Sequence, residues 1–270
     1  DGELRYIQVF AKPQMDQELQ ITGTFAIIHD ITDRKKAEEK RIIRSQFEEM
    51  LSNVSTRFIN VDNEDINNEI NAVLKHIGLF EKVDRTVIFH IDQKVKTMGI
   101  THEWYREGLH SELQDLQNIP IDDFPWLIDQ ISCDPLIIQR VKDLSAVASR
   151  EKAVFEQMGI KSVAVFPMWV NLELVGFVGF EALETEHHWD DENIAMLQQF
   201  TNVISNALER SRLLKILEDR AIRDELTGVL NRRGFLQIAN IELSRAHRYN
   251  HPVGLILLDM DHLKNINDTY

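Results

Sequence analysis

The N-terminal residues predict two strands joined as a hairpin. Residues 5–10 alternate polar and apolar side chains, as expected of a half-buried strand. Residues 22–28 form a second β-rich run, and the polar stretch 12–20 between them is typical of a hairpin connection. Because two strands cannot close a hydrophobic core, we expect the remainder of this domain to lie upstream of Asp1.

From Arg34 the pattern becomes that of a helix. Apolar residues recur at spacings of four, three and four among Lys, Arg and Glu side chains, at Ile43, Phe47, Met50 and Val54. This spacing gives a helix one narrow apolar stripe, and its basic residues are best interpreted as a solvated face. The stripe either pairs with a second helix or lies on the chain's own next domain.

An α/β unit is predicted over residues 47–210. Its helices end at turn signals such as Gly159, and its last two strands are joined by the short turn 171–173. The predicted elements are a helix over 65–78, a strand over 86–91, a helix over 151–158, and strands over 161–170 and 174–180.

A long helix is predicted to open at Trp189-Asp190-Asp191-Glu192, where an Asp is available as N-cap. Its apolar seam changes phase after Leu208. Such a change locally over- or underwinds a coiled coil, so residues 211–222 are interpreted as a regulated helical linker or as a frayed interdomain helix.

A third unit begins at Arg223 and is too short for a typical domain. Asn231 can cap a helix, and residues 253–258 are a near-continuous apolar run, which predicts a buried strand. Asp259 and Asp261 follow this strand directly, and α/β folds place their chemistry at such strand ends.

Composition narrows the class of protein. Hydrophobic residues make up 43% and charged residues 27%, as in chains that bury a core. The formal charge of −14 argues against nucleic-acid binding, because holding phosphates needs clustered positive charge. One cysteine, Cys133, fits a reducing compartment, and we expect a cytoplasmic location. The apolar runs are too short to span a membrane. Because the sequence starts at Asp1, we expect it to be a fragment, and a membrane anchor upstream of Asp1 is not excluded.

The residues after the predicted strand 253–258 suggest phosphate chemistry. Asp259 is a candidate ligand for Mg²⁺, which prefers hard oxygen donors and substrate phosphates. Lys264 can bring positive charge to the same phosphates, and the amide of Asn267 suits a base edge. The alternative is a strand end with polar caps and a surface lysine.

Two strings in this unit resemble the GGDEF domain of diguanylate cyclases. Residues 224–235 read D-E-L-T-G-V-L-N-R-R-G-F, and residues 258–268 read L-D-M-D-H-L-K-N-I-N-D. The resemblance implies that Asp259 and the Met260 carbonyl hold Mg²⁺, that Lys264 steadies charge at the transferring phosphates, and that Asn267 recognises guanine.

The same resemblance implies a reaction and a dimer. Two GGDEF domains, each carrying one GTP, meet so that each 3′-hydroxyl attacks the other nucleotide's α-phosphorus and cyclic di-GMP forms. Leu263 stands where the family usually has Phe, and the GG(D/E)EF loop lies beyond Tyr270. The fragment alone is therefore expected to be inactive.

The other units resemble further signalling domains. Residues 30–38, D-I-T-D-R-K-K-A-E, resemble the close of a PAS domain that leads into a signalling helix. Residues 47–210 resemble a GAF domain through V-D-R-T-V-I-F, T-H-E-W, G-I-K-S and G-F-V-G-F. The expected fold class is α/β (α+β), with a GAF-type antiparallel sheet flanked by helices. The expected organisation is a PAS remnant over 1–33, a signalling helix over 34–54, GAF over 47–210, a linker over 211–222 and truncated GGDEF over 223–270.

The ligand of the GAF unit is not predicted by its residues. Cys133 is expected to be a buried structural cysteine rather than a chromophore-linking thiol. His187 and His188 are expected in a solvated loop, since adjacent residues rarely converge on one metal ion. Aromatic side chains could line a pocket or belong to the core, namely Phe89, Trp104, Trp126 and Trp169.

Three functions follow from these resemblances. The first is the sensory part of a diguanylate cyclase that forms a homodimer through its helices and GGDEF domains. The second is a GTP-binding GGDEF domain without turnover that controls a downstream cyclic di-GMP phosphodiesterase. The third is a dimerising ligand sensor only.

Overall fold

The computed structural model describes residues 4–15, 21–61 and 65–258 of the 270-residue chain. The chain divides into two compact units, residues 1–209 and residues 210–270.

The N-terminal hairpin is confirmed, with longer strands than predicted. Strand β1 (Ile7–Met15) pairs antiparallel with β2 (Ile21–Asp30), and Ile7 lies opposite Asp30. Residues 12–15 belong to β1 rather than to the connection, because residues 21–25 supply partners for them across the ladder. Within the described residues this sheet has only these two strands, and Phe10 and Ile28 are 56% and 65% exposed.

Helix α1 (Thr32–Asn60) follows the hairpin directly. Tyr6 N–H donates to Thr32 Oγ1 at 2.9 Å, and Ile31 N–H donates to the Tyr6 carbonyl, so the hairpin's base is bonded to the helix start. The predicted apolar stripe is exposed in the first part of the helix and buried in the second. Phe47 and Val54 are buried in the core of the following domain, whereas Ile43 is 44% exposed. From Phe47 onward the stripe therefore lies on the chain's own domain.

A six-stranded antiparallel sheet forms the centre of that domain, in the order β5-β4-β3-β8-β7-β6. The strands are β3 (Arg85–Asp92), β4 (Thr97–Tyr105), β5 (Ile119–Pro120), β6 (Leu136–Ile138), β7 (Ser162–Val170) and β8 (Glu173–Ala182). The β7–β8 turn places Asn171 and Leu172 at φ of 49° and 67°, the left-handed conformation that matches the twist of a hairpin. The predicted strands at 86–91, 161–170 and 174–180 are confirmed.

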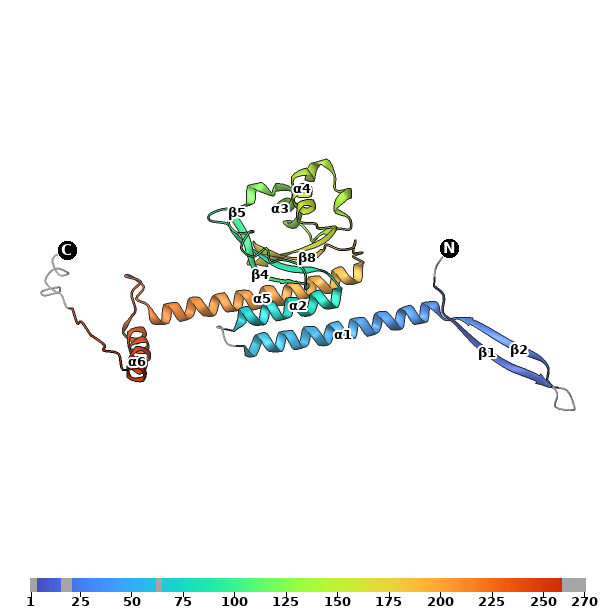
Figure 1. Cartoon of the computed structure of the whole chain (residues 1–270), viewed down its shortest axis with the longest axis horizontal. Coiled ribbons are helices and arrows are strands. Elements are labelled where there is room, and N and C mark those ends of the chain that lie inside the picture. Colours follow the sequence, from blue (N-terminus) through green and yellow to red (C-terminus); the bar gives the residue numbers. More distant parts are fainter. Residues whose placement is uncertain (1–3, 16–20, 62–64, 259–270) are drawn as a thin grey trace. The chain divides into compact units, whose positions relative to one another are not determined.

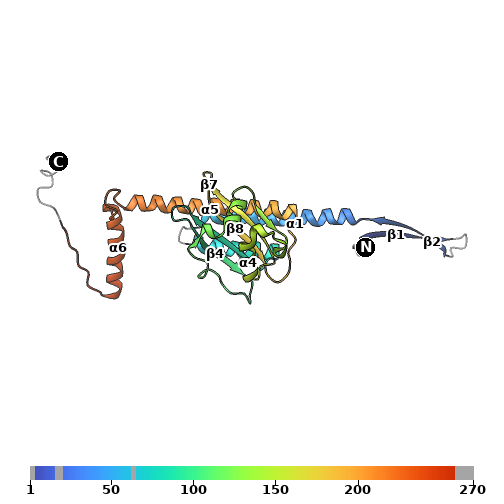
Figure 2. The same cartoon turned by 90° about the horizontal axis from the view of Figure 1, so that it is seen from above.

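Helices cover both faces of the sheet, which confirms the α+β class (Figure 1). On one face α1, α2 (Ile66–Glu81) and α5 (Asp191–Ile222) share a core with Ile88, Phe166 and Phe180. On the other face Val87, Phe89 and Phe177 pack against the short helices α3 (Pro125–Ile131) and α4 (Ser149–Gln157). Figure 2 shows the strands and α4 from above, over α5. Three 3-10 turns complete the connections, at Ile121–Asp123, Val141–Asp143 and Ala146–Ala148.

The second unit contains the end of α5 and helix α6 (Arg232–Tyr249). The predicted cap at Asn231 is confirmed, because its side chain accepts from Gly234 N–H at 3.0 Å. The predicted buried strand at 253–258 is wrong for the structure: the segment pairs with no strand, and the exposed fraction of its side chains reaches 92% at Leu257. An apolar strand of this kind needs neighbouring strands, and the described part of this unit supplies none.

Candidate functional site

The residues predicted to carry the chemistry lie outside the described part of the chain. Asp259, Met260, Lys264 and Asn267 all belong to the segment 259–270. The structure describes the first of the two motif strings, which forms the α5–α6 turn, and the two faces of the large sheet.

The string 224–235 builds the turn between α5 and α6. Asp224 Oδ1 accepts from Thr227 N–H at 2.9 Å and from Thr227 Oγ1–H at 2.7 Å, and these bonds hold the pKa of Asp224 below its usual value. Gly228 has φ of +71°, where a side chain would be strained. A Cβ on Gly234 would lie 2.3 Å from the Ile222 carbonyl oxygen. These residue types are therefore required by the backbone of the turn itself.

Asn231 ties the two ends of this turn together. Its amide nitrogen donates to the carbonyls of Ala221 at 3.0 Å and Arg223 at 3.2 Å, while its oxygen caps α6. One side chain thus fixes the last residues of α5 to the first turn of α6. The sequence predicted only the cap, because the two donated bonds depend on where α5 ends.

An apolar cavity of about 50 Å³ lies between the sheet and the helices α3 and α4. Phe89 and Phe177 stack at 4.7 Å between ring centroids and form part of its wall. Ligand sites for drug-sized molecules have volumes of about 300–1,000 Å³. The cavity therefore accepts a group of a few atoms unless its aromatic walls move apart.

The four aromatic residues proposed from the sequence divide between these environments. Phe89 lines the cavity, and Trp126 packs against the same core. Trp104 lies on the other face, against α2, and Trp169 is 43% exposed. The pocket interpretation thus holds for Phe89 alone among these four.

A buried charge cluster lies at one end of the cavity. Arg85 and Glu181 are opposite each other in the β3–β8 register, are 2% and 6% exposed, and approach to 2.6 Å. Glu112 lies 3.4 Å from the same guanidinium. Burial alone would lower the pKa of Arg85, but the negative charges of Glu181 and Glu112 raise it, so Arg85 stays charged. Glu181 is the only charged residue among the described residues that line the cavity, and Arg85 contacts it from outside the lining.

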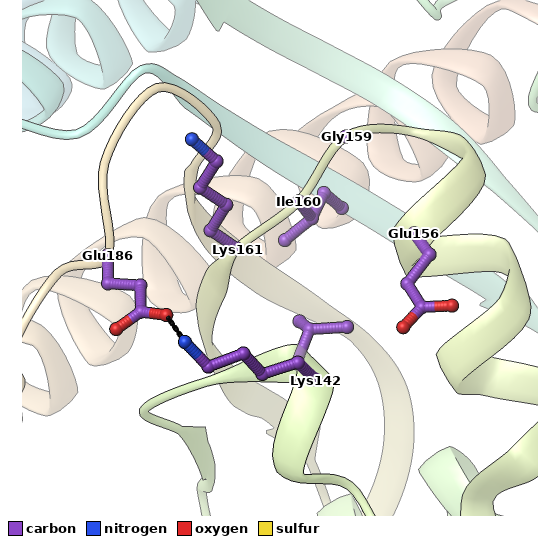
Figure 3. A pocket seen from close by; sticks show the side chains of 7 residues that line it. Lys142, Glu156, Gly159, Ile160, Lys161 and Glu186 are labelled. Carbon is purple, nitrogen blue, oxygen red and sulfur yellow. Dashed lines mark hydrogen bonds and ion pairs between the residues drawn. The ribbon is translucent and has the colours of Figure 1, made fainter.

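A polar cleft of about 250 Å³ lies near the end of α4 (Figure 3). Lys142 points toward Glu186 and forms an ion pair with it, while Lys161 Nζ donates to the Glu184 carbonyl. Glu156 faces the same cleft from α4. The lysines already have partners within the protein, so the cleft is largely neutralised by its own residues.

The predictions for the cysteine and for the adjacent histidines can be compared with the structure. Cys133 is exposed, so the expectation of a buried cysteine is wrong; it lies just past α3, where the chain turns at the surface. His187 is half-buried, and its ring lies 4.2 Å from that of Trp189, while His188 is exposed. In the part of the chain that the structure describes, no three His, Cys, Asp or Glu side chains gather in a metal-binding arrangement.

A buried carboxyl group, which the sequence did not single out, lies where α2 meets α5. Glu81 is 4% exposed, and its Oε2 accepts from Asn193 Nδ2 at 3.0 Å. Burial, followed by the charge of Asp190, raises the pKa of Glu81 to about 7, against the hydrogen bond from Asn193. A signal was present: Glu81 follows Ile77 by four residues, so it continues the apolar face of α2.

No described helix combines the length and the apolar character that crossing a membrane requires.

Two family profiles match the chain. The GAF domain matches residues 65–208, more than half of the chain, and the GGDEF domain of diguanylate cyclases matches residues 221–270.

Relatives come from both signalling and cyclase proteins. The methanogenesis regulatory histidine kinase FilI of Methanothrix harundinacea is 29% identical over 240 residues, which are 86% of this chain and 26% of FilI. The probable diguanylate cyclase DgcC of Escherichia coli is 37% identical over 62 residues, 23% of this chain and 16% of DgcC. The chain thus spans about a quarter of the length of FilI and less of DgcC.

Solved structures share the fold of the larger unit. A phycocyanobilin-bound GAF domain from a cyanobacterial phytochrome superposes with a TM-score of 0.52 at 19% identity, over 62% of this chain and 96% of that domain. The chromophore-binding domain of a bacteriophytochrome from R. palustris gives 0.55 at 12% identity, over 64% of this chain and 63% of that one. Because the GAF domain profile matches more than half of its residues, the chain belongs to the GAF domain family, and the segment that follows its GAF domain matches the GGDEF domain of diguanylate cyclases.

Proposed function

We propose that this chain is the sensory and regulatory portion of a diguanylate cyclase that makes cyclic di-GMP from two GTP. One observation carries the proposal. Helix α5 is continuous from Asp191 to Ile222, so it begins within the residues that match GAF and ends within those that match GGDEF. A change in how the GAF core holds α5 would thereby reach the first residues of the GGDEF segment.

The part of the chain before the GGDEF segment is proposed to be the input. The similarity to FilI, which is named a regulatory histidine kinase, extends over 86% of this chain and supports a sensory unit that serves different outputs. The β1–β2 hairpin is proposed to be the end of a PAS domain. In support, its apolar side chains are exposed on both faces, as expected of strands that belong to a larger sheet.

A bilin, the ligand of some solved relatives, does not fit this GAF domain as it stands. The cavity of about 50 Å³ is far too small for a tetrapyrrole, and Cys133 is not among the residues that line it. The mainly apolar walls of this cavity are suited to a small apolar molecule.

In the GGDEF segment we propose the roles that the resemblance to diguanylate cyclases implies, and the chemistry of the residues is compatible with them. The donor set of the Asp259 carboxylate and the Met260 carbonyl fits Mg²⁺, since both are hard oxygen ligands. Bound there, Mg²⁺ would supply charge neutralisation at the phosphates. Lys264 would add positive charge at the transferring phosphates, and Asn267 would donate to and accept from the guanine edge.

Turnover requires two GGDEF domains, so the active form is proposed to be a homodimer. In support, α1 exposes Ile42 and Ile43, and the end of α5 exposes Leu213 and Leu217. Apolar side chains of this kind on helices are suited to pairing with a second helix. The lone cysteine and the nucleotide substrate support a cytoplasmic location.

The proposal is tested on the intact protein with GTP and Mg²⁺. Asp259→Ala is expected to abolish formation of cyclic di-GMP while the fold is kept, as judged by circular dichroism. Asn267→Ala is expected to weaken GTP binding more than it slows turnover at saturating GTP. Unchanged GTP affinity in the Asn267 variant would contradict its assignment, and an unimpaired Asp259 variant would remove that residue from the metal site.

A further inference from the structure

Glu81 is the last residue of α2 and is enclosed by the GAF core. Its side chain is 4% exposed, although an isolated carboxylate is costly to bury. Oε2 accepts one hydrogen bond, from Asn193 Nδ2 at 3.0 Å. Oε1 is buried and has no hydrogen-bond partner among the described residues. The group is therefore much better accommodated when it is protonated than when it is charged.

Asn193 makes the opposite side of this contact from the first turn of α5. Its side chain donates to Glu81, and its backbone N–H donates to Asp190 Oδ1 at 2.8 Å, which caps the helix. The residue thus links the start of α5 both to its own cap and to the end of α2. Among the described residues, this is the side-chain hydrogen bond that joins the end of α2 to the start of α5.

The charged groups around Glu81 do not neutralise a carboxylate. Asp190, in the segment before α5, repels a negative charge, and Asp191 and Glu192 already occupy the N-terminal turn where the helix dipole favours acids. Other charged groups of the adjoining segments do not compensate it either. Asp84 pairs with Arg106, and Lys40 of α1 pairs with Glu192. Among the described residues, Lys82, His187 and His188 make no hydrogen bond or ion pair with Glu81.

We propose that Glu81 is a proton-dependent latch that holds the start of α5 against the end of α2. With the proton bound, the Glu81–Asn193 hydrogen bond is kept and the core stays closed. When the proton is lost, a buried negative charge faces Asp190 without a cation, and the first turn of α5 opens so that the carboxylate reaches water. Any effect of this latch on cyclic di-GMP synthesis rests on the proposed regulatory function, whereas the latch itself does not.

The direction of the pH dependence follows from the two environments of the carboxyl group. In the closed state the pKa of Glu81 is about 7, whereas in an opened, hydrated state it returns to its ordinary value of about 4.5. Between these values the closed state keeps a proton that the open state loses. The opening equilibrium constant should therefore rise by up to about tenfold per pH unit in this window and level off above it.

The test is amide hydrogen exchange of residues 191–200 in the 270-residue chain between pH 5 and pH 8, corrected for the intrinsic exchange rate. Wild type is expected to show an opening constant that rises by about tenfold per pH unit up to about pH 7. Glu81→Gln, which resembles the protonated form, should change by less than about twofold. Glu156→Gln removes an exposed glutamate of α4 and should follow the wild-type profile.

A ¹³C titration of the Glu81 carboxyl by NMR gives a second readout that does not depend on a variant. A midpoint near 7 is expected, and a midpoint near 4.5, the ordinary value, would overturn the latch. Identical exchange profiles for wild type and Glu81→Gln would overturn it as well. If the intact protein makes no cyclic di-GMP, the proposed function fails, while the exchange and titration results still decide whether the latch exists.

Discussion

Gly78 of α2 lies directly against the indole ring of Trp104 of β4, so closely that a Cβ on Gly78 would be 2.3 Å from Cζ3. The absence of a side chain at this position lets the helix pack on the sheet. The same helix carries Glu81 as its last residue.

Gly78→Ala is therefore expected to destabilise the GAF domain. In an exposed helix the same change stabilises by about 1 kcal/mol. Here the ring must shift, and overpacking of a core costs about 1–3 kcal/mol. We expect a net loss of about 1–2 kcal/mol in urea denaturation. The double variant with Trp104→Ala should cancel the clash, so that Gly78→Ala becomes neutral or stabilising in that background; an equal loss in both backgrounds would contradict the explanation.

The Arg85–Glu181 pair at the end of the cavity predicts a strong asymmetry between single and double variants. Removing one partner of a buried ion pair leaves an uncompensated charge and costs about 3–5 kcal/mol. Glu181→Met should therefore destabilise by an amount in this range, although Glu112 is close enough to reduce it. Replacing both partners by Met should cost much less. Equal losses in the single and double variants, measured by chemical denaturation, would argue against a compensating pair.

Glu151 of α4 caps the start of α3 from a distance in the sequence. Its Oε1 accepts from Trp126 N–H at 3.0 Å and from Leu127 N–H at 3.3 Å, and the side chain is 1% exposed. Loss of a helix cap costs about 0.5–2 kcal/mol, so Glu151→Ala should lower stability by an amount near the upper end of that range. Glu156→Ala, on the exposed side of the same helix, is the matched control and should change the melting temperature little. Similar losses in the two variants would rule out the capping role.

Two buried groups give the stability opposite dependences on pH. Burial lowers the pKa of His102 to about 4, so its contribution is lost as pH falls from about 6.5, the unfolded value, toward 4. The pKa of Glu81 is raised to about 7, so its contribution is present below about 4.5 and is lost as pH rises through 7. The wild-type curve alone therefore combines two effects.

The difference between wild type and Glu81→Gln isolates the carboxyl group. Because one pKa unit corresponds to about 1.4 kcal/mol, wild type should lose about 3 kcal/mol relative to the variant between pH 4.5 and pH 8. The measurement is the free energy of unfolding in urea at each pH. A constant difference across this range would mean that Glu81 ionises equally well in the folded and unfolded states.

The sequence was most informative where local pattern and tertiary role agree. Strands β3, β7 and β8 were predicted because their apolar runs are bounded by turn residues, and both faces of these strands are buried in the structure. The cap at Asn231 was predicted because it depends on one hydrogen bond within its own helix. These features require no knowledge of distant neighbours.

Features that depend on neighbours were predicted poorly. The run 253–258 has the composition of a buried strand, but the described residues of its unit supply no partner strands. Cys133 was placed in the core because cysteine is often buried, whereas the surface turn after α3 exposes it. The roles of Glu81 and Glu181 could not be read from the sequence, since each depends on a residue more than ninety positions away, Asn193 and Arg85 respectively.

The most direct test of the account is to incubate the intact protein with GTP and Mg²⁺ and to measure cyclic di-GMP by mass spectrometry, with Asp259→Ala as the control. We expect product from wild type and none above background from the variant. Absence of product from a wild-type protein that still binds GTP would contradict the cyclase proposal and favour a GGDEF domain that regulates without turnover.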